Sequence, residues 1–516
     1  MNPVVAAAPG AVLRLPLLPG ERWWGGAAAE GRSMPYAADY SFDLRDLRGN
    51  QGMPLLLSNR GRWVHSTGTF TFEVGAEALT VTPHAEASVI EHADGFDDLR
   101  GAYRDVMSRC YPATGALPDP LLFTAPQYNL WIETVFEPTQ QKVLDYAERL
   151  LAEGFPPGVL MIDDQWSASY GDWTFHRGRF PDPAAMVARL HDLGFKVMLW
   201  LVPYVTPDSP TARTLFEAGY LLPDPAERYP AAVGLWWNGL SASLDLGHPD
   251  AVAWFQETLQ RLHTDFGIDG FKFDGGDAEW WRQLGVADPE AYTHTWNRLG
   301  LAWPLNEYRD AWRTAGLPLA QRQQDKYHQW DGRFGVESLI PNALAQAVTG
   351  HAFTCPDMIG GGEFRFVPAE NGYDQELFVR YAQIAALFPM MQFSAAPWRV
   401  LDAEHLAIVR EAALLHAEFG SEILAVAKAS AATGDPVQRP LAWAYPDGGY
   451  EDVTDQFLIG DTLMVAPVTT PGASVREVRI PPGRWRADDG TVYEGPDTVT
   501  VAAPLARLPY FRAVTA

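Results

Sequence analysis

The strongest candidate for a catalytic group is a carboxylate at the end of a predicted buried strand. Residues 268–273 are typical of such a strand, which ends at Asp274 and is followed by Gly275 and Gly276. Upstream, residues 249–265 have the apolar spacing of a helix, so the two segments form one helix-to-strand step of a barrel. Catalytic side chains of such barrels sit at the carboxyl ends of the strands. A carboxylate placed there, beside glycines that let the chain turn sharply, can act as a nucleophile or a base.

Acidic and aromatic residues also follow other predicted strands, and they would gather at the same end of the barrel. Carboxylates, indoles and amides suit sugar hydroxyls, which both donate and accept hydrogen bonds. Two carboxylates that face each other across a sugar can cleave a glycosidic bond without a cofactor. We therefore predict a carbohydrate site, whose substrate-binding residues include Trp131, Asp163, Asp164, Lys272, Trp330 and Asp357.

The elements that must position these residues alternate strand and helix through residues 119–435, which predicts a (β/α)8 TIM barrel. A helix is expected to open at Pro138 and another to span residues 183–193. Besides the strand before Asp274, strands are expected at residues 121–128, 158–164, 195–202, 317–323, 351–355 and 390–394.

Segments rich in short strands flank the barrel on both sides. Residues 1–118 predict an N-terminal β-sandwich and residues 436–516 a C-terminal β-domain. Within the latter we expect a hairpin about Gly460 and Asp461, and a turn at residues 481–485.

Composition and charge limit the classes of binding partner that we expect. The net charge is −25 and no basic patch is evident, which excludes nucleic acid and anionic membranes as expected partners. Cys110 and Cys355 form no disulfide framework or metal-ligand spacing, so we expect buried free thiols and no metal or cofactor. With no run of eighteen apolar residues and no start like a signal peptide, we expect no membrane span and a cytoplasmic protein. Whether the protein forms a homo-oligomer is left open.

Several longer segments carry a family resemblance: APQYNLWIE at 125–133, GFPPGVLMIDD at 154–164, PDMIGG at 356–361 and PMMQFS at 389–394. They resemble glycoside hydrolase family 31, and within it the branch with bacterial α-galactosidases and the myogenesis-regulating glycosidase. The resemblance implies a retaining exo-α-glycosidase, which we expect to act on α-galactosides through a covalent glycosyl-aspartate. The position that matches the family nucleophile is Asp274, and the resemblance also implies Trp200 and Arg322 as substrate-binding residues. Retention requires the second carboxyl group roughly 5 Å away.

That second carboxyl is where the sequence departs from the family. The family's acid/base position falls on Arg333, and an arginine cannot deliver a proton at a useful pH. We therefore predict Asp331 as the acid/base, with Glu337 and Asp325 as alternatives, although Asp325 is expected rather to support the site. Arg333 would then bind a substrate group.

Two other interpretations remain open. The chain could be an α-glucosidase, a transglycosylase or a lyase of the same family, although Ser394 stands where many α-glucosidases carry a histidine. It could instead be a carbohydrate-binding barrel without activity, an interpretation that Arg333 favours.

Overall fold

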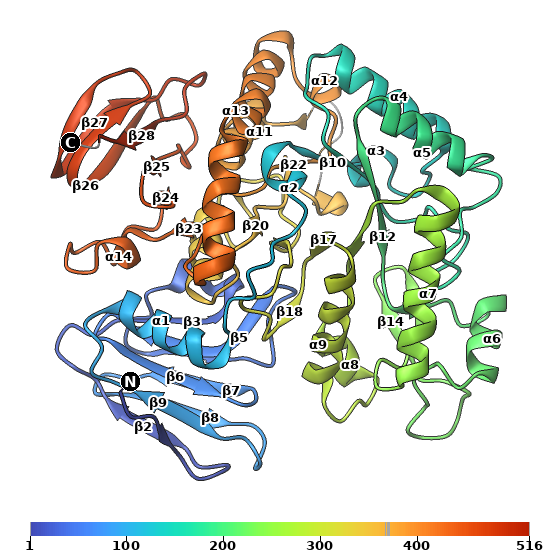
Figure 1. Cartoon of the computed structure of the whole chain (residues 1–516), viewed down its shortest axis with the longest axis horizontal. Helices are drawn as coiled ribbons and strands as arrows, with labels where there is room; N and C mark the ends of the chain where they lie inside the picture. Colours follow the sequence, from blue (N-terminus) through green and yellow to red (C-terminus); the bar gives the residue numbers. More distant parts are fainter. Residues whose placement is uncertain (1, 367, 369–371, 515–516) are drawn as a thin grey trace.

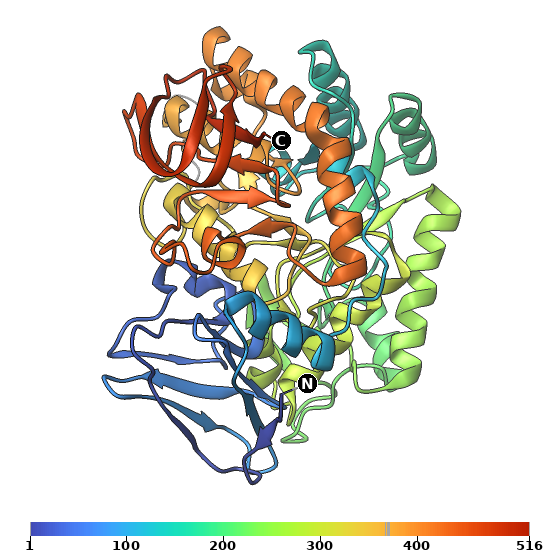
Figure 2. The same cartoon turned by 60° about the vertical axis from the view of Figure 1, so that its left-hand side comes forward.

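Three parts follow one another along the chain in the computed structural model, which describes residues 2–366, 368 and 372–514. The N-terminal strands and the C-terminal strands lie at two positions along the same side of a central barrel (Figure 1). A view turned by 60° shows the same arrangement (Figure 2). The predicted fold class is confirmed.

The barrel is a single parallel sheet whose two ends meet. Its strand order is β20-β19-β17-β16-β12-β11-β10-β22-β21, and every pairing is parallel. Because β20 and β21, the two ends of this order, belong to one chain segment interrupted at Pro356 and Asp357, the sheet closes into eight strand positions. The strands are β10 (Gln127–Asn129), β11 (Val159–Ile162), β12 (Lys196–Leu201), β16 (Gly270–Phe273), β17 (Leu305–Tyr308), β19 (Gln321–Arg322), β20 (Thr354–Cys355), β21 (Met358–Ile359) and β22 (Gln392–Phe393).

Helices connect these strands, and their ends carry clear start and stop residues. The helix before the Asp274 strand begins with Pro249 at its first position and ends before Gly267, whose φ of 77° suits only glycine readily. The longer helices are α4 (Gln140–Ala152), α5 (Pro183–Asp192), α6 (Pro210–Glu217), α7 (Pro249–Phe266), α9 (Pro289–Leu299), α10 (Leu339–Val348), α11 (Gln375–Ala386) and α13 (Ala403–Thr433). Among the described residues, none of the helices is long and apolar enough to cross a membrane.

A small antiparallel sheet is inserted between β12 and α7. Its strands are β13 (Tyr204–Val205), β14 (Val233–Trp236) and β15 (Gly239–Ser243), in the order β13-β15-β14. The insertion matters for the site because it carries Trp236 and Trp237 to the mouth of the barrel.

The N-terminal part packs two sheets around one core, with α1 (Leu99–Cys110) against β5 and β6 of the larger sheet. Strand β18 (Ala311–Trp312), which belongs to the barrel segment, extends the larger sheet by pairing Ala311 with Gln51. The larger sheet contains β1 (Val5–Ala6), β3 (Trp23–Ala27), β5 (Gln51–Ser58), β6 (Arg62–Ser66), β9 (Ile90–Ala93) and β18; the smaller contains β2 (Leu13–Pro16), β4 (Tyr40–Asp43), β7 (Phe70–Val74) and β8 (Ala78–Pro83).

The C-terminal part has its own hydrophobic core. Its hairpin pairs Ile459 with Leu463, which confirms the turn about Gly460 and Asp461. The predicted turn at 481–485 is wrong, because these residues lie inside β26, where a β-bulge between Ile480 and Gly483 accommodates the two prolines. The strands are β23 (Gln438–Arg439), β24 (Phe457–Ile459), β25 (Leu463–Val465), β26 (Val475–Ala487), β27 (Val492–Ala502) and β28 (Tyr510–Ala513).

Three details of the barrel prediction need correction. Residues 121–124 form a short helix, α2 (Leu121–Thr124), so the first strand starts only at Gln127; a short apolar run does not distinguish the two states. Helix α4 starts at Gln140 instead of Pro138, because the Thr139 side chain caps it by accepting from Lys142 N at 3.2 Å. Strand β17 was not predicted, since its sequence LNEY places polar residues inside the barrel.

Candidate active site

A cavity of about 160 Å³ lies where the barrel strands end at their carboxyl termini. Residues at or shortly after the ends of β10, β11, β12, β16, β17 and β21 contribute to it, as does the loop after β19. This is the end of the barrel at which chemistry is expected. The lining consists of Trp131, Asp163, Asp164, Trp200, Trp236, Trp237, Lys272, Asp274, Arg309, Asp325, Met358, Gly362, Glu363, Phe364 and Arg365.

Asp274 is held by hydrogen bonds on both carboxylate oxygens. Oδ1 accepts from Arg309 Nε at 2.9 Å and from the Gly275 backbone N–H at 2.8 Å, whereas Oδ2 accepts from Trp200 Nε1 at 2.9 Å. Burial works to raise the pKa of Asp274, but the positive charges of Arg309, Lys272 and Arg322 outweigh it and hold the pKa far below its usual range. The carboxylate is therefore ionised and fixed in orientation.

Lys272 lies beside Asp274 but bonds to a different carboxylate. Its Nζ is 2.8 Å from Asp163 Oδ2, and both side chains are almost fully buried. Burial works to lower the pKa of Lys272, and Asp163 more than compensates, so Lys272 remains protonated. The pair presents a buried positive and a buried negative group to the cavity, a suitable arrangement for recognising hydroxyls.

Asp164, next to Asp163, is in a different electrostatic state. Its Oδ2 accepts from the Tyr170 hydroxyl at 2.8 Å, and its Oδ1 accepts from the Gln165 backbone N–H at 2.6 Å. Burial raises the pKa of Asp164 to about 7, and the charge of Asp163 adds to the rise. Around neutral pH this carboxyl group can therefore donate a hydrogen bond as well as accept one.

Aromatic rings form one wall of the cavity. The rings of Trp200 and Trp236 are stacked, with centroids 6.1 Å apart and planes inclined by 24°. Trp131 is fixed by a 2.8 Å hydrogen bond from Nε1 to the Gly362 carbonyl, and its ring meets Trp237 edge to face at 5.8 Å. Such surfaces pack well against the apolar faces of a ring-shaped ligand.

Arg322 is fully buried and pairs with three carboxylates. Its guanidinium is 2.8 Å from Asp325 Oδ1 and 3.3 Å from Glu307 Oε1, and it also contacts Asp357. Asp325 is the exposed member, with 40% of its side chain accessible, whereas Arg322, Glu307 and Asp357 are buried. Arg322 and Asp357 do not line the cavity, and Arg322 pairs with Asp325, which does; the substrate contacts of Arg322 and Asp357 stay a prediction.

The predicted acid/base and its neighbours lie outside the cavity lining. The loop closes on itself through Tyr327 N and the Phe334 carbonyl, 2.7 Å apart, and it leaves Asp331 exposed. Trp330 donates from Nε1 to Asp374 at 2.8 Å, and Arg333 is 41% exposed with its Nη2 3.9 Å from Glu30. Since none of Trp330, Asp331 and Arg333 lines the cavity, the structure does not place them with Asp274.

Some lining residues were missed in the sequence. Arg309 follows β17 directly, and it went unnoticed because that strand was not recognised. Trp237 lies in the turn between β14 and β15, whereas Glu363 precedes and Arg365 lies in the short 3-10 helix Phe364–Phe366; no periodicity marks them in the sequence. In contrast, Trp131, Asp163, Asp164, Trp200, Lys272 and Asp274 are brought together as predicted.

Two groups of the described residues could hold a metal ion, and one of them borders this site. Asp277, Glu279 and Asp310 bring oxygens within 4.8 Å of one another. Burial raises the pKa of Asp310 well above its usual range and that of Glu279 to about 7, and Arg309 already neutralises Asp277 at 2.9 Å. The cluster is thus balanced by protons and one guanidinium.

Comparison with known proteins identifies the domains. Residues 120–419 match the model of the glycosyl hydrolases family 31 TIM-barrel domain, and residues 434–513 match that of the family 31 C-terminal domain. The myogenesis-regulating glycosidase of Mus musculus is 35% identical over 412 residues, which cover 77% of this chain and 57% of that protein. The α-xylosidase XylQ of Lactiplantibacillus pentosus is 25% identical over 480 residues, which cover 87% and 60%. The chain thus spans less than two thirds of these relatives' length.

Solved structures agree in fold. A family 31 dextranase of Flavobacterium johnsoniae, complexed with glucose, superposes with a TM-score of 0.85 at 20% identity, covering 97% of this chain and 66% of that one. An α-xylosidase from a soil metagenome, complexed with xylose, gives 0.84 at 20% identity, covering 98% and 79%. Fold and cavity define a (β/α)8-barrel protein with an acidic site, in which a β-domain precedes the barrel in the chain and another follows it. Together with the family models, this shows that the chain belongs to glycoside hydrolase family 31.

Proposed function

We propose that the protein is a retaining α-glycosidase that removes single terminal sugars and uses Asp274 as its nucleophile. The observation that carries the proposal is the state of Asp274: an ionised carboxylate, aimed into a cavity by Arg309 and Trp200. A cavity of about 160 Å³ is small beside the roughly 300–1,000 Å³ of sites for drug-sized ligands, which favours one sugar ring and hence exo action.

In the first step Asp274 attacks the anomeric carbon, and the glycosidic oxygen leaves. Oδ2 is the attacking atom that the geometry favours, because it accepts one hydrogen bond, from Trp200, whereas Oδ1 is held by both Arg309 and the Gly275 N–H. A covalent glycosyl-aspartate forms, and water then attacks the same carbon, so the configuration is retained. Lys272 and Asp163 would hold hydroxyl groups of the sugar.

The proton for the leaving oxygen needs a carboxylic acid that reaches the cavity. We propose Asp325 in this role in preference to Asp331, since Asp325 lines the cavity with a partly exposed carboxylate and Asp331 does not. Arg322, 2.8 Å away, fixes the position of Asp325. General acid catalysis of this kind contributes about 10²–10⁴-fold.

The sugar that we propose to test first is α-galactose. The support is the resemblance of segments such as 125–133 and 356–361 to the branch that contains bacterial α-galactosidases. Other relatives are an α-glucosidase of Bacillus thermoamyloliquefaciens and α-xylosidases, so α-glucosides and α-xylosides are the natural competitors.

The test is hydrolysis of nitrophenyl α-galactoside, α-glucoside and α-xyloside by the purified protein, with D274A as the matched control. Nitrophenolate leaves without a proton, so this step reports the nucleophile more than the acid. Turnover by the wild type but not by D274A, with the α-anomer as first product in NMR spectra, supports the proposal. Turnover that survives D274A, or a β-anomer as first product, refutes it.

A second candidate function is carbohydrate binding without catalysis, because Arg333 occupies the family's acid position. The same experiment separates the two. No turnover of any of the three glycosides, combined with quenching of tryptophan fluorescence by free galactose, would favour the binding protein, since Trp131, Trp200 and Trp236 line the cavity.

A further inference from the structure

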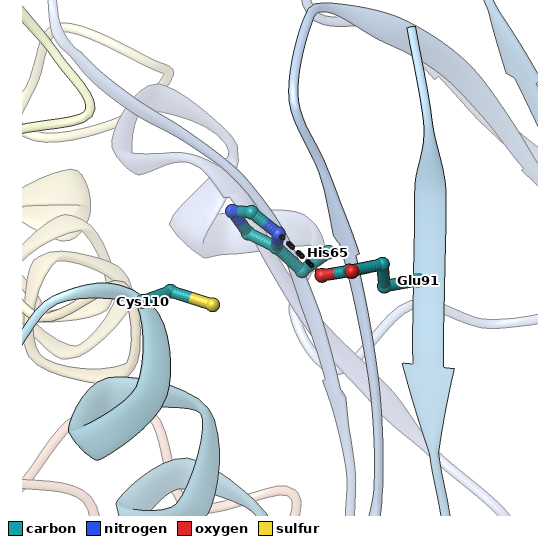
Figure 3. A group of neighbouring side chains, drawn as sticks. All are labelled: His65, Glu91 and Cys110. Atoms are coloured by element: carbon teal, nitrogen blue, oxygen red, sulfur yellow. Dashed lines mark ion pairs between the residues drawn. The ribbon is translucent and has the colours of Figure 1, made fainter. Parts of the chain in front are cut away.

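Three side chains with metal-binding atoms meet on the N-terminal sandwich, outside the active-site cavity (Figure 3). They are His65 on β6, Glu91 on β9 and Cys110, the last residue of α1. One ligand atom from each residue lies within 4.8 Å of the other two. The three positions are far apart in the sequence, so they do not form a recognisable metal-binding motif.

The fold itself brings these residues together. His65 and Glu91 are direct partners in the antiparallel pairing of β6 and β9, so their side chains project from the same face of the sheet. Helix α1 packs against β6 and delivers Cys110 to that face with its final residue. The positions of the three residues are thus set by strand register and by the docking of the helix.

The His65 ring is oriented so that one nitrogen is available. The residue is 5% exposed, and its Nε2 is 2.9 Å from the Tyr111 hydroxyl oxygen. Its Nδ1 is 3.8 Å from Glu91 Oε2 and has no hydrogen-bond partner among the described residues. When Nε2–H donates to Tyr111, Nδ1 presents its lone pair to the cluster. Metal-ligating histidines are commonly held through their other nitrogen in this way.

We propose that His65, Glu91 and Cys110 bind one zinc ion through Nδ1, a carboxylate oxygen and the sulfur, with water as the fourth ligand. This nitrogen, oxygen and thiolate set suits zinc and does not suit magnesium or calcium, which prefer oxygen alone. On binding, the thiol proton passes to solvent, and the thiolate and carboxylate charges then balance the two charges of the ion.

The three ligand atoms have to move only a short distance to reach the geometry of a zinc site. Zinc bonds of about 2.0–2.3 Å place tetrahedral ligands roughly 3.3–3.8 Å apart, so a separation at the 4.8 Å limit would have to shrink by about 1–1.5 Å. Cys110 ends its helix and Glu91 has a side chain that is 36% exposed, so both can move toward the buried His65. Cys110 also lines a groove of about 790 Å³ between the sandwich and the barrel, which gives an ion access. A bound ion would fasten the end of α1 to the sheet.

The experiment uses the full chain, reduced and stripped of metal with a chelator, and titrated with Co²⁺ under argon. We expect a near-ultraviolet thiolate-to-cobalt charge-transfer band that saturates at one equivalent and disappears when Zn²⁺ is added. C110S should lack the band. Two matched controls should keep the band. They are C355S, at the other cysteine, and H92Q, whose residue lies next to Glu91 on β9 and faces the opposite side of the sheet.

Thermal unfolding supplies a second readout. Zn²⁺ should raise the Tm of the wild type and of H92Q, and leave that of C110S unchanged. Should C110S not fold, E91Q replaces it, because Glu91 is partly exposed; its affinity for Co²⁺ should fall at least about tenfold. The absence of the band in folded wild-type protein, or a band that survives C110S and is lost in C355S, overturns the proposal.

Discussion

Arg309 donates from Nε to Oδ1 of Asp274 at 2.9 Å, and this contact links the proposed nucleophile to a distant part of the chain. The Nη1 of the same guanidinium donates to the carbonyl of Gly49 at 2.9 Å, and Nη2 pairs with Asp277. Gly49 belongs to the N-terminal part. The orientation of the proposed nucleophile therefore depends on a loop of the sandwich.

Replacing Arg309 should shift the pH dependence of activity. In R309Q the pKa of Asp274 should rise, because Arg309 is the largest of the charges that lower it. The acidic limb of the pH profile, where protonation of Asp274 abolishes activity, should therefore move to higher pH. We expect kcat/KM near neutral pH to fall by about 10²–10³-fold, the range that follows removal of one preorganised hydrogen-bond donor from an active site. The measurement is the pH profile of kcat/KM for the best nitrophenyl glycoside.

R189Q serves as the control for Arg309, since Arg189 lies on the surface helix α5 and pairs with Glu148 at 3.0 Å. An unshifted acidic limb in R309Q would contradict the role of Arg309 in keeping Asp274 ionised.

The two candidate acids should differ in their response to the leaving group. D325N should lose about 10²–10⁴-fold in kcat/KM on a disaccharide, whose leaving oxygen needs a proton, and much less on the nitrophenyl glycoside. D331N should behave like the wild type on both, because its side chain is exposed outside the cavity. The measurement is kcat/KM of each variant on both substrates. A large loss in D331N on the disaccharide, with D325N unaffected, would identify Asp331 as the general acid instead.

Substitution of Gly49 should affect catalysis although the residue lies in the sandwich. Its φ is 67°, and a Cβ at this position would collide with Arg309 Nη1. We expect G49A to lower kcat more than it raises KM, since the displaced arginine positions the nucleophile. G219A is the matched control: its φ is 73°, and nothing lies within 4 Å of its Cβ. Equal losses of kcat in both variants would indicate that backbone strain alone is responsible.

Asp164 should make stability depend on pH. Its pKa is about 7 when folded and near 3.8 when unfolded, so its stabilising contribution is full below about pH 4 and is lost as the pH rises through 7. Relative to D164N, the free energy of unfolding of the wild type should therefore decrease by about 4 kcal/mol between pH 4 and pH 8. Urea unfolding of both proteins at several pH values measures this difference, and parallel curves would show that Asp164 stays ionised.

The sequence predicted the parts of the site that follow apolar strands. Asp163, Asp164 and Asp274 each come directly after a buried hydrophobic run, so their common location followed from the barrel rule. Arg309 was beyond reach because β17 has the sequence LNEY, whose Asn306 and Glu307 are buried among other polar groups and break the hydrophobic pattern.

The loop that carries the predicted acid shows a second limit of sequence reasoning. Asp331 and Asp325 are both close to the family's acid position along the chain, and counting residues favoured Asp331. Which of them faces the cavity is decided by tertiary contacts, namely the closure between Tyr327 and Phe334 and the ion pair of Asp325 with Arg322. Neither contact leaves a periodic trace in the sequence.

The pairing of β18 with β5 has a consequence for how such proteins can evolve. Ala311 and Trp312 leave the barrel to complete a sheet that otherwise consists of N-terminal strands, and the Trp312 side chain is part of the sandwich core. Exchange of the sandwich for an unrelated domain would expose that core residue and leave backbone groups without partners. The two parts are therefore expected to be inherited as a single recombination unit, in which neither behaves as an interchangeable module.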